Sequence, residues 1–224
     1  MPKVERAAVP RTKKPNLGHD IVHVLVGTEL KDFSIHKDII CHYSPFFKAA
    51  FTSDFQEGKS SIMKLPEQRT EVFEIFYQWI YYQTLESLSD NNKLLEKRAF
   101  TLIRLYIFAE MAQIPTLMNQ AIDRVYEILE MVNKTPCSMV PYIWAETPPN
   151  SPLRRFIRDR VIWRVQPELL HSQELPIHIS REFLADALSS AMSALQRKTA
   201  NPLIDVSNYY VEVTTSKADT MSST

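Results

Sequence analysis

The spacing of apolar residues changes within the stretch 33–55, and the change predicts a strand followed by two helices. Phe33 and Ile35 alternate with polar neighbours, which is typical of a strand with one buried face. The period lengthens after His36 from two residues to about three and a half, as on a helix. The apolar residues that recur at this spacing are Ile39, Ile40 and Tyr43. We expect this stretch to be the packing nucleus of the chain.

Ser44 and Pro45 predict the start of the second helix, because a Ser hydroxyl caps free amides and Pro is tolerated at a first helical position. The apolar face of that helix comprises Phe46, Phe47, Ala50 and Phe51. After it, residues 58–61 are expected to form a loop. Residues 62–65 are expected to form a short third strand that ends at Pro66.

The residues before the nucleus predict a β-hairpin. The stretch 21–26 is almost wholly apolar, which suits a strand covered on both faces. Residues 27–29 can turn the chain back into a second strand over residues 30–36. We therefore expect a hairpin to open the domain.

Three apolar stripes at helical spacing follow the third strand. The first belongs to a helix that begins near Thr70 and carries Val72, Phe73, Ile75, Phe76, Trp79, Ile80 and Tyr82. A polar connection is expected over residues 84–97. The second stripe is Leu102, Leu105, Tyr106 and Ala109, and the third is Leu117, Ala121, Ile122, Val125, Ile128 and Leu129. Residues 113–115 break the helix and Thr116 can cap the next, so the two helices should form an antiparallel hairpin.

The C-terminal third predicts a helical extension after the proline-rich boundary 147–152. Its first helix has Leu153, Phe156, Ile157 and Val161 inward, and Arg154, Arg155, Arg158, Arg160 and Arg164 mostly outward. Ser180 is expected to cap a last helix whose apolar side carries Leu184, Leu188, Ala191 and Leu195. These helices are expected to extend the helical layer of the preceding domain.

The composition excludes several function classes. The 224 residues contain 26 basic and 26 acidic side chains, so no whole-molecule charge attracts nucleic acid or an anionic membrane. The three glycines lie too far apart for a phosphate-binding loop, which argues against nucleotide-dependent enzymes. The chain has two cysteines, no apolar run near a membrane span and no signal-peptide core. A cytoplasmic or nuclear location with reduced thiols is expected.

The two ends of the chain are expected to be disordered. Residues 1–18 are basic, contain three prolines and offer almost nothing to bury. A nuclear-targeting or phosphate-contacting role for residues 11–14 is the alternative to a solvated arm. From Thr199 onward the chain is polar and expected to be mostly disordered, although residues 209–213 have a strand-like pattern.

The side chains around Cys41 do not predict a metal site or a nucleophile. Histidines occur nearby at His19, His23, His36 and His42, but no tight Cys or His ligand pair exists. Cys41 has His42 and Asp38 beside it, yet neighbours along a helix point in different directions. We expect Cys41 to be a buried small hydrophobe, and no catalytic site, metal or cofactor.

The order of these elements and several motifs together resemble the BTB/POZ domain. The resemblance runs from about Asp20 to about Glu130. The family pattern has an Asp opening the first strand, a V-x-V-G type turn, F-x-x-H-K and S-x-x-F-x-x-x-F, which are met at Asp20 and at residues 24–27, 33–37 and 44–51. Later matches lie at residues 76–81, 105–110 and 114–117. The overall style, including residues 151–155, resembles fungal proteins that carry a BTB domain and no other recognisable domain.

The resemblance implies an α+β fold over residues 19–131, with a small three-stranded sheet and a helical cluster, followed by an α-helical extension over residues 132–198. It implies a non-enzymatic protein-interaction module. Its expected partners are a second copy of the chain, a cullin scaffold of a ubiquitin ligase, or a transcriptional corepressor. The arm before Asp20 lacks the amphipathic helix of domain-swapped dimers. No kelch repeats or zinc fingers follow, so a cullin adaptor made from this chain would recruit its target through the C-terminal region.

Two partner-binding sites follow from the resemblance. Asp20 and Lys37 match a charged pair near the groove of some dimeric members, and the alternative is that they cap a strand and a helix. Phe55, Gln56 and Glu57 match the hydrophobic-x-Glu motif that cullin-binding members place after the second helix. The aromatic would fill a pocket on the partner while the carboxylate pairs at its rim. The alternative is a polar surface loop with an incidental Phe.

A different function class stays open from the sequence. The basic arm and the arginine-rich helix could serve a transcription-associated nuclear factor, whose DNA binding would depend steeply on salt. No aromatic side chains are interleaved with these arginines for base stacking, so nucleic acid is the less expected partner.

Overall fold

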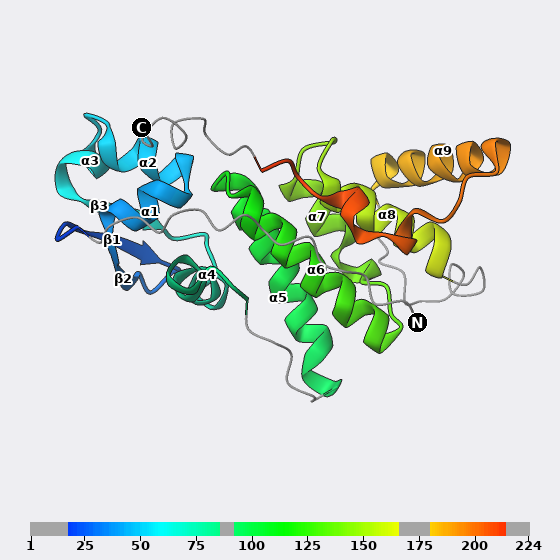
Figure 1. Cartoon of the computed structure of the whole chain (residues 1–224), viewed down its shortest axis with the longest axis horizontal. Helices are drawn as coiled ribbons and strands as arrows, with labels where there is room; N and C mark the ends of the chain where they lie inside the picture. The colour runs from blue at the N-terminus through cyan, green and yellow to red at the C-terminus, as the bar shows by residue number, and fades with distance from the viewer. Residues whose placement is uncertain (1–17, 86–91, 166–179, 214–224) are drawn as a thin grey trace, which may run out of the picture.

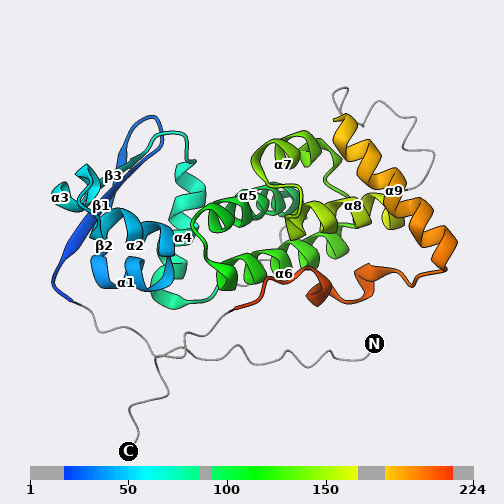
Figure 2. The same ribbon diagram turned by 90° about the horizontal axis from the view of Figure 1, so that it is seen from above.

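A computed structural model describes residues 18–85, 92–165 and 180–213 of the chain (Figure 1). The predicted basic arm therefore lies outside the described residues except for Gly18. The molecule is elongated, with the β-sheet at one end, a long helical hairpin in the middle and the C-terminal helices at the other end. Figure 2 shows the same order from above.

The sheet has three strands in the order β2-β1-β3. β1 (Ile21–Val26) and β2 (Lys31–His36) form the predicted antiparallel hairpin, and β3 (Ile62–Leu65) runs parallel to β1 on its other side. Gly27 has a φ of 78° in the connecting turn, where its carbonyl accepts a hydrogen bond from the Leu30 N–H at 3.0 Å. A left-handed φ favours Gly at this position.

Only one face of β1 is fully covered, so the predicted burial of both faces is wrong. Val22, Val24 and Val26 are completely buried, whereas Ile21 is 39% exposed. The residues between the valines are half-buried. The valines belong to the same buried core as residues of α1 and α4, whereas within the described residues the alternate positions of β1 are at most half-buried.

The nucleus forms as predicted up to the end of its second helix. α1 (Lys37–Tyr43) begins directly after β2, and α2 (Pro45–Thr52) follows Ser44. The buried Ser44 hydroxyl accepts a hydrogen bond from the Phe47 N–H at 3.2 Å and donates one to the Ala112 carbonyl at 2.6 Å. Ser44 therefore caps α2 and ties it to the end of α5.

The predicted loop at residues 58–61 is wrong, because a short helix occupies most of it. α3 (Gln56–Ser60) begins after Phe55 and is followed by Ser61, which has a left-handed backbone conformation. The five residues of α3 bury no side chain, so no apolar periodicity marks this helix in the sequence.

Three longer helices complete the central layer: α4 (Thr70–Tyr82), α5 (Asn92–Met111) and α6 (Pro115–Val132). α4 and the hairpin of α5 and α6 confirm the predicted helices. α5 starts at Asn92, inside the segment 84–97 that was predicted to be a connection. The residue before α6 is Ile114 rather than the predicted cap Thr116, and Pro115 takes the first helical position.

Aromatic rings from three helices fill the centre of the core. Phe47 lies with its ring centroid 5.9 Å from Phe76 and 6.4 Å from Phe108, and Phe76 lies 5.0 Å from Phe108. All three are at most 2% exposed. This cluster joins α2, α4 and α5 and fixes the helices against the sheet.

The C-terminal helices pack on the far side of α5 and α6 (Figure 1). They are α7 (Val140–Glu146), α8 (Pro152–Arg164) and α9 (Arg181–Arg197), with a single 3-10 turn η1 (Cys137–Met139) before α7. The predicted cap of α9 is confirmed, since the Ser180 side chain accepts a hydrogen bond from the Phe183 N–H at 3.1 Å.

The segment after α9 runs back across α8 to α6, as Figure 2 shows, so the predicted disorder from Thr199 is wrong for the described part. Two 3-10 turns, η3 (Pro202–Ile204) and η4 (Val206–Tyr209), bury Leu203 and Tyr209. The Asn119 side chain then pairs with Val211, donating to its carbonyl at 2.9 Å and accepting from its N–H at 2.8 Å. A side chain therefore takes the role of the partner strand that the pattern of residues 209–213 suggested.

Candidate functional site

Phe55 is the sequence-predicted site residue that the structure exposes most clearly. Its side chain is 73% exposed although it lies three residues after the end of α2, which supplies two core aromatics. Phe55 precedes the first turn of α3, where Gln56 is exposed and Glu57 is half-buried. A large ring held in water carries a free-energy cost unless a partner covers it, and aromatic residues are enriched among interface hot spots.

A close backbone contact fixes the position of α3. A Cβ atom on Gly58 would lie 2.0 Å from the Ser53 carbonyl oxygen and 3.4 Å from that of Ala50, so only Gly fits here. The Lys59 N–H donates to the Phe55 carbonyl at 3.2 Å, which closes the first turn. The end of α2 thus holds α3, and with it the direction in which Phe55 points.

Gly58→Ala is expected to lower the free energy of unfolding by about 1–3 kcal/mol, because the new methyl group forces the backbone of α3 away from Ser53. Urea unfolding followed by circular dichroism measures this change. Ala has the higher helix propensity by about 1 kcal/mol, so a net loss reports the clash itself. Lys59→Ala, an exposed change in the same helix, is the control and should stay within about 0.5 kcal/mol of wild type. A Gly58→Ala protein as stable as wild type would contradict the contact.

A backbone hydrogen bond, rather than an ion pair between the side chains, brings Asp20 and Lys37 together. The Lys37 N–H donates to the Asp20 carbonyl at 2.9 Å, where the entry to β1 meets the start of α1. The Asp20 side chain is exposed and that of Lys37 is half-buried. Among the described residues no ion pair joins the two side chains. The role of this pair in partner binding stays a prediction.

The arginine-rich helix is mostly committed to internal contacts, so its predicted outward orientation is wrong at two positions. Arg154 is 4% exposed and Arg160 is 1% exposed. Carboxylates pair with Arg154 (Glu182), Arg158 (Asp159), and both Arg160 and Arg164 (Glu130). Of the five arginines, Arg155 alone is exposed and has no carboxylate within ion-pair distance in the described part of the chain. Helical periodicity missed this because an arginine can be buried when hydrogen bonds satisfy its guanidinium.

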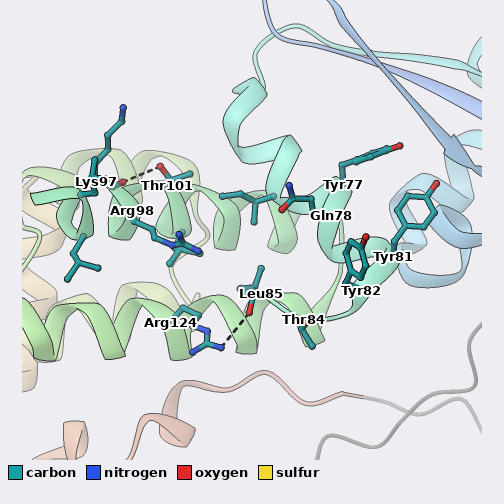
Figure 3. Close-up of a pocket in the computed structure, with 14 residues that line it drawn as sticks. Tyr77, Gln78, Tyr81, Tyr82, Thr84, Leu85, Lys97, Arg98, Thr101 and Arg124 are labelled. Atoms are coloured by element: carbon teal, nitrogen blue, oxygen red, sulfur yellow. Dashed lines mark hydrogen bonds between the residues drawn. The ribbon is translucent and has the colours of Figure 1, made fainter. Parts of the chain in front are cut away.

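A cavity of about 1010 Å³ lies between α4, α5 and α6 (Figure 3). Its described lining is apolar, aromatic, basic and, at Gln78, Thr84 and Thr101, uncharged polar, without His, Cys, Asp or Glu. The Tyr77 hydroxyl donates to the Ser34 carbonyl at 3.3 Å, and the Tyr81 hydroxyl accepts from the His36 N–H at 3.4 Å. In Figure 3 the Arg124 guanidinium points to the Leu85 carbonyl. These polar groups serve the fold, and Tyr77 and Tyr81 cover the edge of β2.

Cys41 lies in a setting that disfavours a nucleophile. Its side chain is half-buried and its sulfur lies 3.9 Å from the Phe47 carbonyl. Burial raises the pKa of the Cys41 thiol, so less of the reactive thiolate is present at neutral pH. No group of three or more His, Cys, Asp and Glu side chains that could hold a metal ion occurs within residues 18–85, 92–165 and 180–213.

The small mixed sheet, the helical cluster over its valine face and the exposed aromatic beside α3 define an α+β domain with a surface suited to protein contacts. Residues 14–122 match the family model of the BTB/POZ domain. This part of the chain is a BTB/POZ domain, a type of domain that generally mediates protein–protein interaction rather than catalysis. The match begins at residue 14, inside the segment 1–18 that we predicted from the sequence to be a disordered basic arm.

The chain is also similar to the Kelch repeat and BTB domain-containing protein 4 of Mus musculus and of Homo sapiens. It is 21% identical to each over 176 residues, which covers 79% of this chain and 30% of each relative. The chain thus spans under a third of the length of these relatives, and the similarity continues beyond the BTB/POZ domain. No helix among the described residues is long and apolar enough to span a membrane.

Proposed function

We propose that the chain is an adaptor whose BTB domain docks onto a cullin-type scaffold through Phe55, Gln56 and Glu57. The observation that supports this is the 73% exposure of Phe55 directly before α3, a helix that a glycine contact holds in place. The ring would enter an apolar pocket on the scaffold, and the Glu57 carboxylate would pair at the rim of that pocket. Because α3 is already held in place, less conformational entropy would be lost when Phe55 binds a partner.

The similarity to Kelch and BTB domain-containing relatives supports an adaptor role, since the family resemblance associates such proteins with cullin scaffolds. Assembly with a second copy or with a corepressor-like protein are the other outcomes that a BTB domain allows. Asp20 and Lys37 are proposed to contribute to such contacts, because they lie together where β1 begins and α1 begins.

The double change Phe55→Ala and Glu57→Ala is expected to abolish co-purification of a cullin with the full chain, which corresponds to a loss of about 2 kcal/mol or more of binding free energy. The thermal unfolding midpoint should stay unchanged because neither side chain is fully buried. Affinity purification followed by mass spectrometry measures the binding, and calorimetry measures the unfolding.

Tyr82→Ala is the matched control for this experiment. Tyr82 carries an aromatic side chain of similar size and exposure, 74% against 73% for Phe55. It lies at the cavity between α4, α5 and α6 rather than beside α3. Cullin binding should survive Tyr82→Ala. Retained binding in the Phe55 and Glu57 variant would remove the cullin proposal and leave an interaction domain with another partner.

The alternative of a nucleic-acid-associated factor is weakened by the arginine pairs of α8. Four of its five arginines already contact carboxylates, and two of them are buried. Phosphate binding would require these contacts to break, so no second function is proposed.

A further inference from the structure

The apolar side of α9, which the sequence predicted without assigning it to the core or to the surface, faces away from the protein. Leu184, Leu188, Met192 and Leu195 are exposed by 54%, 63%, 51% and 80%. They recur at spacings of three and four residues, so they form one stripe along the helix, roughly 16 Å long at 1.5 Å per residue. We call these four residues the α9 stripe.

α9 is attached to the protein through a different face, which carries mostly small side chains. Phe183 is buried against Trp144, with ring centroids 4.9 Å apart in an edge-to-face arrangement, and Glu182 pairs with the buried Arg154. Half-buried residues continue this face along the helix: Ala187, Ser190 and Ala194. The attachment therefore does not use the α9 stripe, and the large aliphatic side chains stay exposed in the part of the chain that the structure describes.

The charges around the α9 stripe are all of one sign. Arg181 stands one turn before Leu184 and Lys198 one turn after Leu195, so a cation ends the stripe on each side. The carboxylates of α9 lie on other faces, since Glu182 pairs with Arg154 and Asp186 is half-buried. A complementary partner therefore needs apolar side chains in the middle and carboxylates at both ends.

We propose that the α9 stripe binds an amphipathic helix of a partner protein, with aliphatic side chains at helical spacing and acidic residues at its two ends. Helices recognise apolar stripes through anchors at such spacings. A second copy of α9 does not fit this description. An antiparallel pair sets Arg181 against Lys198 and a parallel pair sets Arg181 against Arg181, so like charges meet either way.

A membrane surface is a poorer match to the same stripe. A helix that lies in a membrane interface carries a strongly charged face opposite its apolar face. The charged residues of α9 opposite the stripe are Glu182, Asp186 and Arg197, which carry both signs, whereas helices that bind a membrane surface have a polar face rich in Lys and Arg. In Figure 1, α9 and α3 lie at opposite ends of the molecule, so the proposed site can be occupied together with Phe55.

Two synthetic helical peptides test whether the α9 stripe binds an amphipathic helix. Each has about five turns and carries a leucine stripe along one face. One has glutamates at its two ends and the other has lysines. Fluorescence anisotropy with the full chain is expected to show binding of the glutamate peptide and about tenfold weaker binding of the lysine peptide. The double change Leu188→Lys and Leu195→Lys should weaken the glutamate peptide at least about tenfold. The reversal Arg181→Glu and Lys198→Glu should exchange the preference between the two peptides.

The control is Ser189→Lys with Gln196→Lys, which adds the same charges to exposed positions of α9 beside the stripe and should leave binding within about twofold. The Phe55 and Glu57 variant should bind the glutamate peptide as wild type does, which separates this site from the proposed cullin site. Equal binding of both peptides, or unchanged binding by the Leu188 and Leu195 variant, would overturn the proposal.

Three further results would also overturn it. One is a lower unfolding midpoint of the Leu188 and Leu195 variant, which would show that the intact chain already covers the α9 stripe. Another is a dimer in light scattering that this variant abolishes, which would make a second copy the occupant. The third is co-sedimentation with phosphatidylserine-containing vesicles that this variant abolishes, which would make a membrane the occupant.

Discussion

Phe47→Ala is expected to lower the free energy of unfolding by about 3–5 kcal/mol, the range for truncating a fully buried Phe. The ring of Phe47 is completely buried and lies near the rings of Phe51, Phe76 and Phe108. The cavity that Ala leaves would be shared by α2, α4 and α5, and rigid helices on three sides can collapse into it only partly. Urea unfolding followed by circular dichroism measures the loss.

Phe46→Ala is the matched control for this prediction. Phe46 is the preceding residue of the same helix, carries the same ring and is only partly buried against the core. Its truncation should cost clearly less than that of Phe47. Equal losses for the two variants would mean that the aromatic cluster of α2, α4 and α5 is not the centre of stability.

The second large effect is expected at the junction between the BTB domain and the C-terminal helices. Arg160 of α8 pairs with Glu130 of α6 at 2.7 Å and donates to the carbonyls of Leu129 at 3.2 Å and Lys134 at 3.1 Å. Burial lowers the pKa of the Arg160 guanidinium, and the Glu130 carboxylate acts against that shift. The carboxylate and carbonyls at and just after the end of α6 therefore compensate the buried guanidinium for its lost hydration.

Arg160→Met is expected to cost about 3 kcal/mol, the lower end of the range for removing one partner of a buried pair. Met fills similar volume but leaves the two carbonyls without their donor, while Glu130 keeps some access to water. Urea unfolding measures the cost, and limited proteolysis should show earlier cleavage between α6 and α8.

Arg164→Met is the control, because Arg164 pairs with the same carboxylate at the same 2.7 Å but has a side chain 38% exposed against 1% for Arg160. An exposed pair is worth at most about 1 kcal/mol. If both variants lost the same free energy, burial of the guanidinium would not be what makes the junction stable.

Together the two proposed sites describe a molecule that joins two proteins. α3, which Phe55 directly precedes, lies beside the sheet, α9 lies among the C-terminal helices, and the α5–α6 hairpin lies between α3 and α9 (Figure 1). The contacts of Arg160 and the return of the chain from Tyr209 to Val211 hold the C-terminal helices against α6. Tyr209 donates to the buried Asp159 at 2.9 Å within that connection. A stiff connection would keep the two partners at a constant separation.

Local patterns in the sequence determined the hairpin, the change from strand to helix at His36 and Lys37, the Ser44 cap and the apolar faces of α4 and α6. Each depends on residues close together in the chain, where period and capping chemistry are strong signals. The sequence also pointed to Phe55, which is exposed, although only the resemblance to BTB domains separated it from an incidental surface Phe, and its binding role stays a prediction.

Tertiary structure alone decided which face of α9 docks, where Arg154 and Arg160 point, and that residues 201–213 pack against α6 and α8. A helical pattern shows that apolar side chains share a face, but it does not say whether that face meets the core or a partner. In the same way, an arginine is buried only where carbonyls and a carboxylate distant in sequence surround its guanidinium. The sequence therefore determined the BTB fold, and long-range contacts decided which surfaces that fold leaves for other proteins.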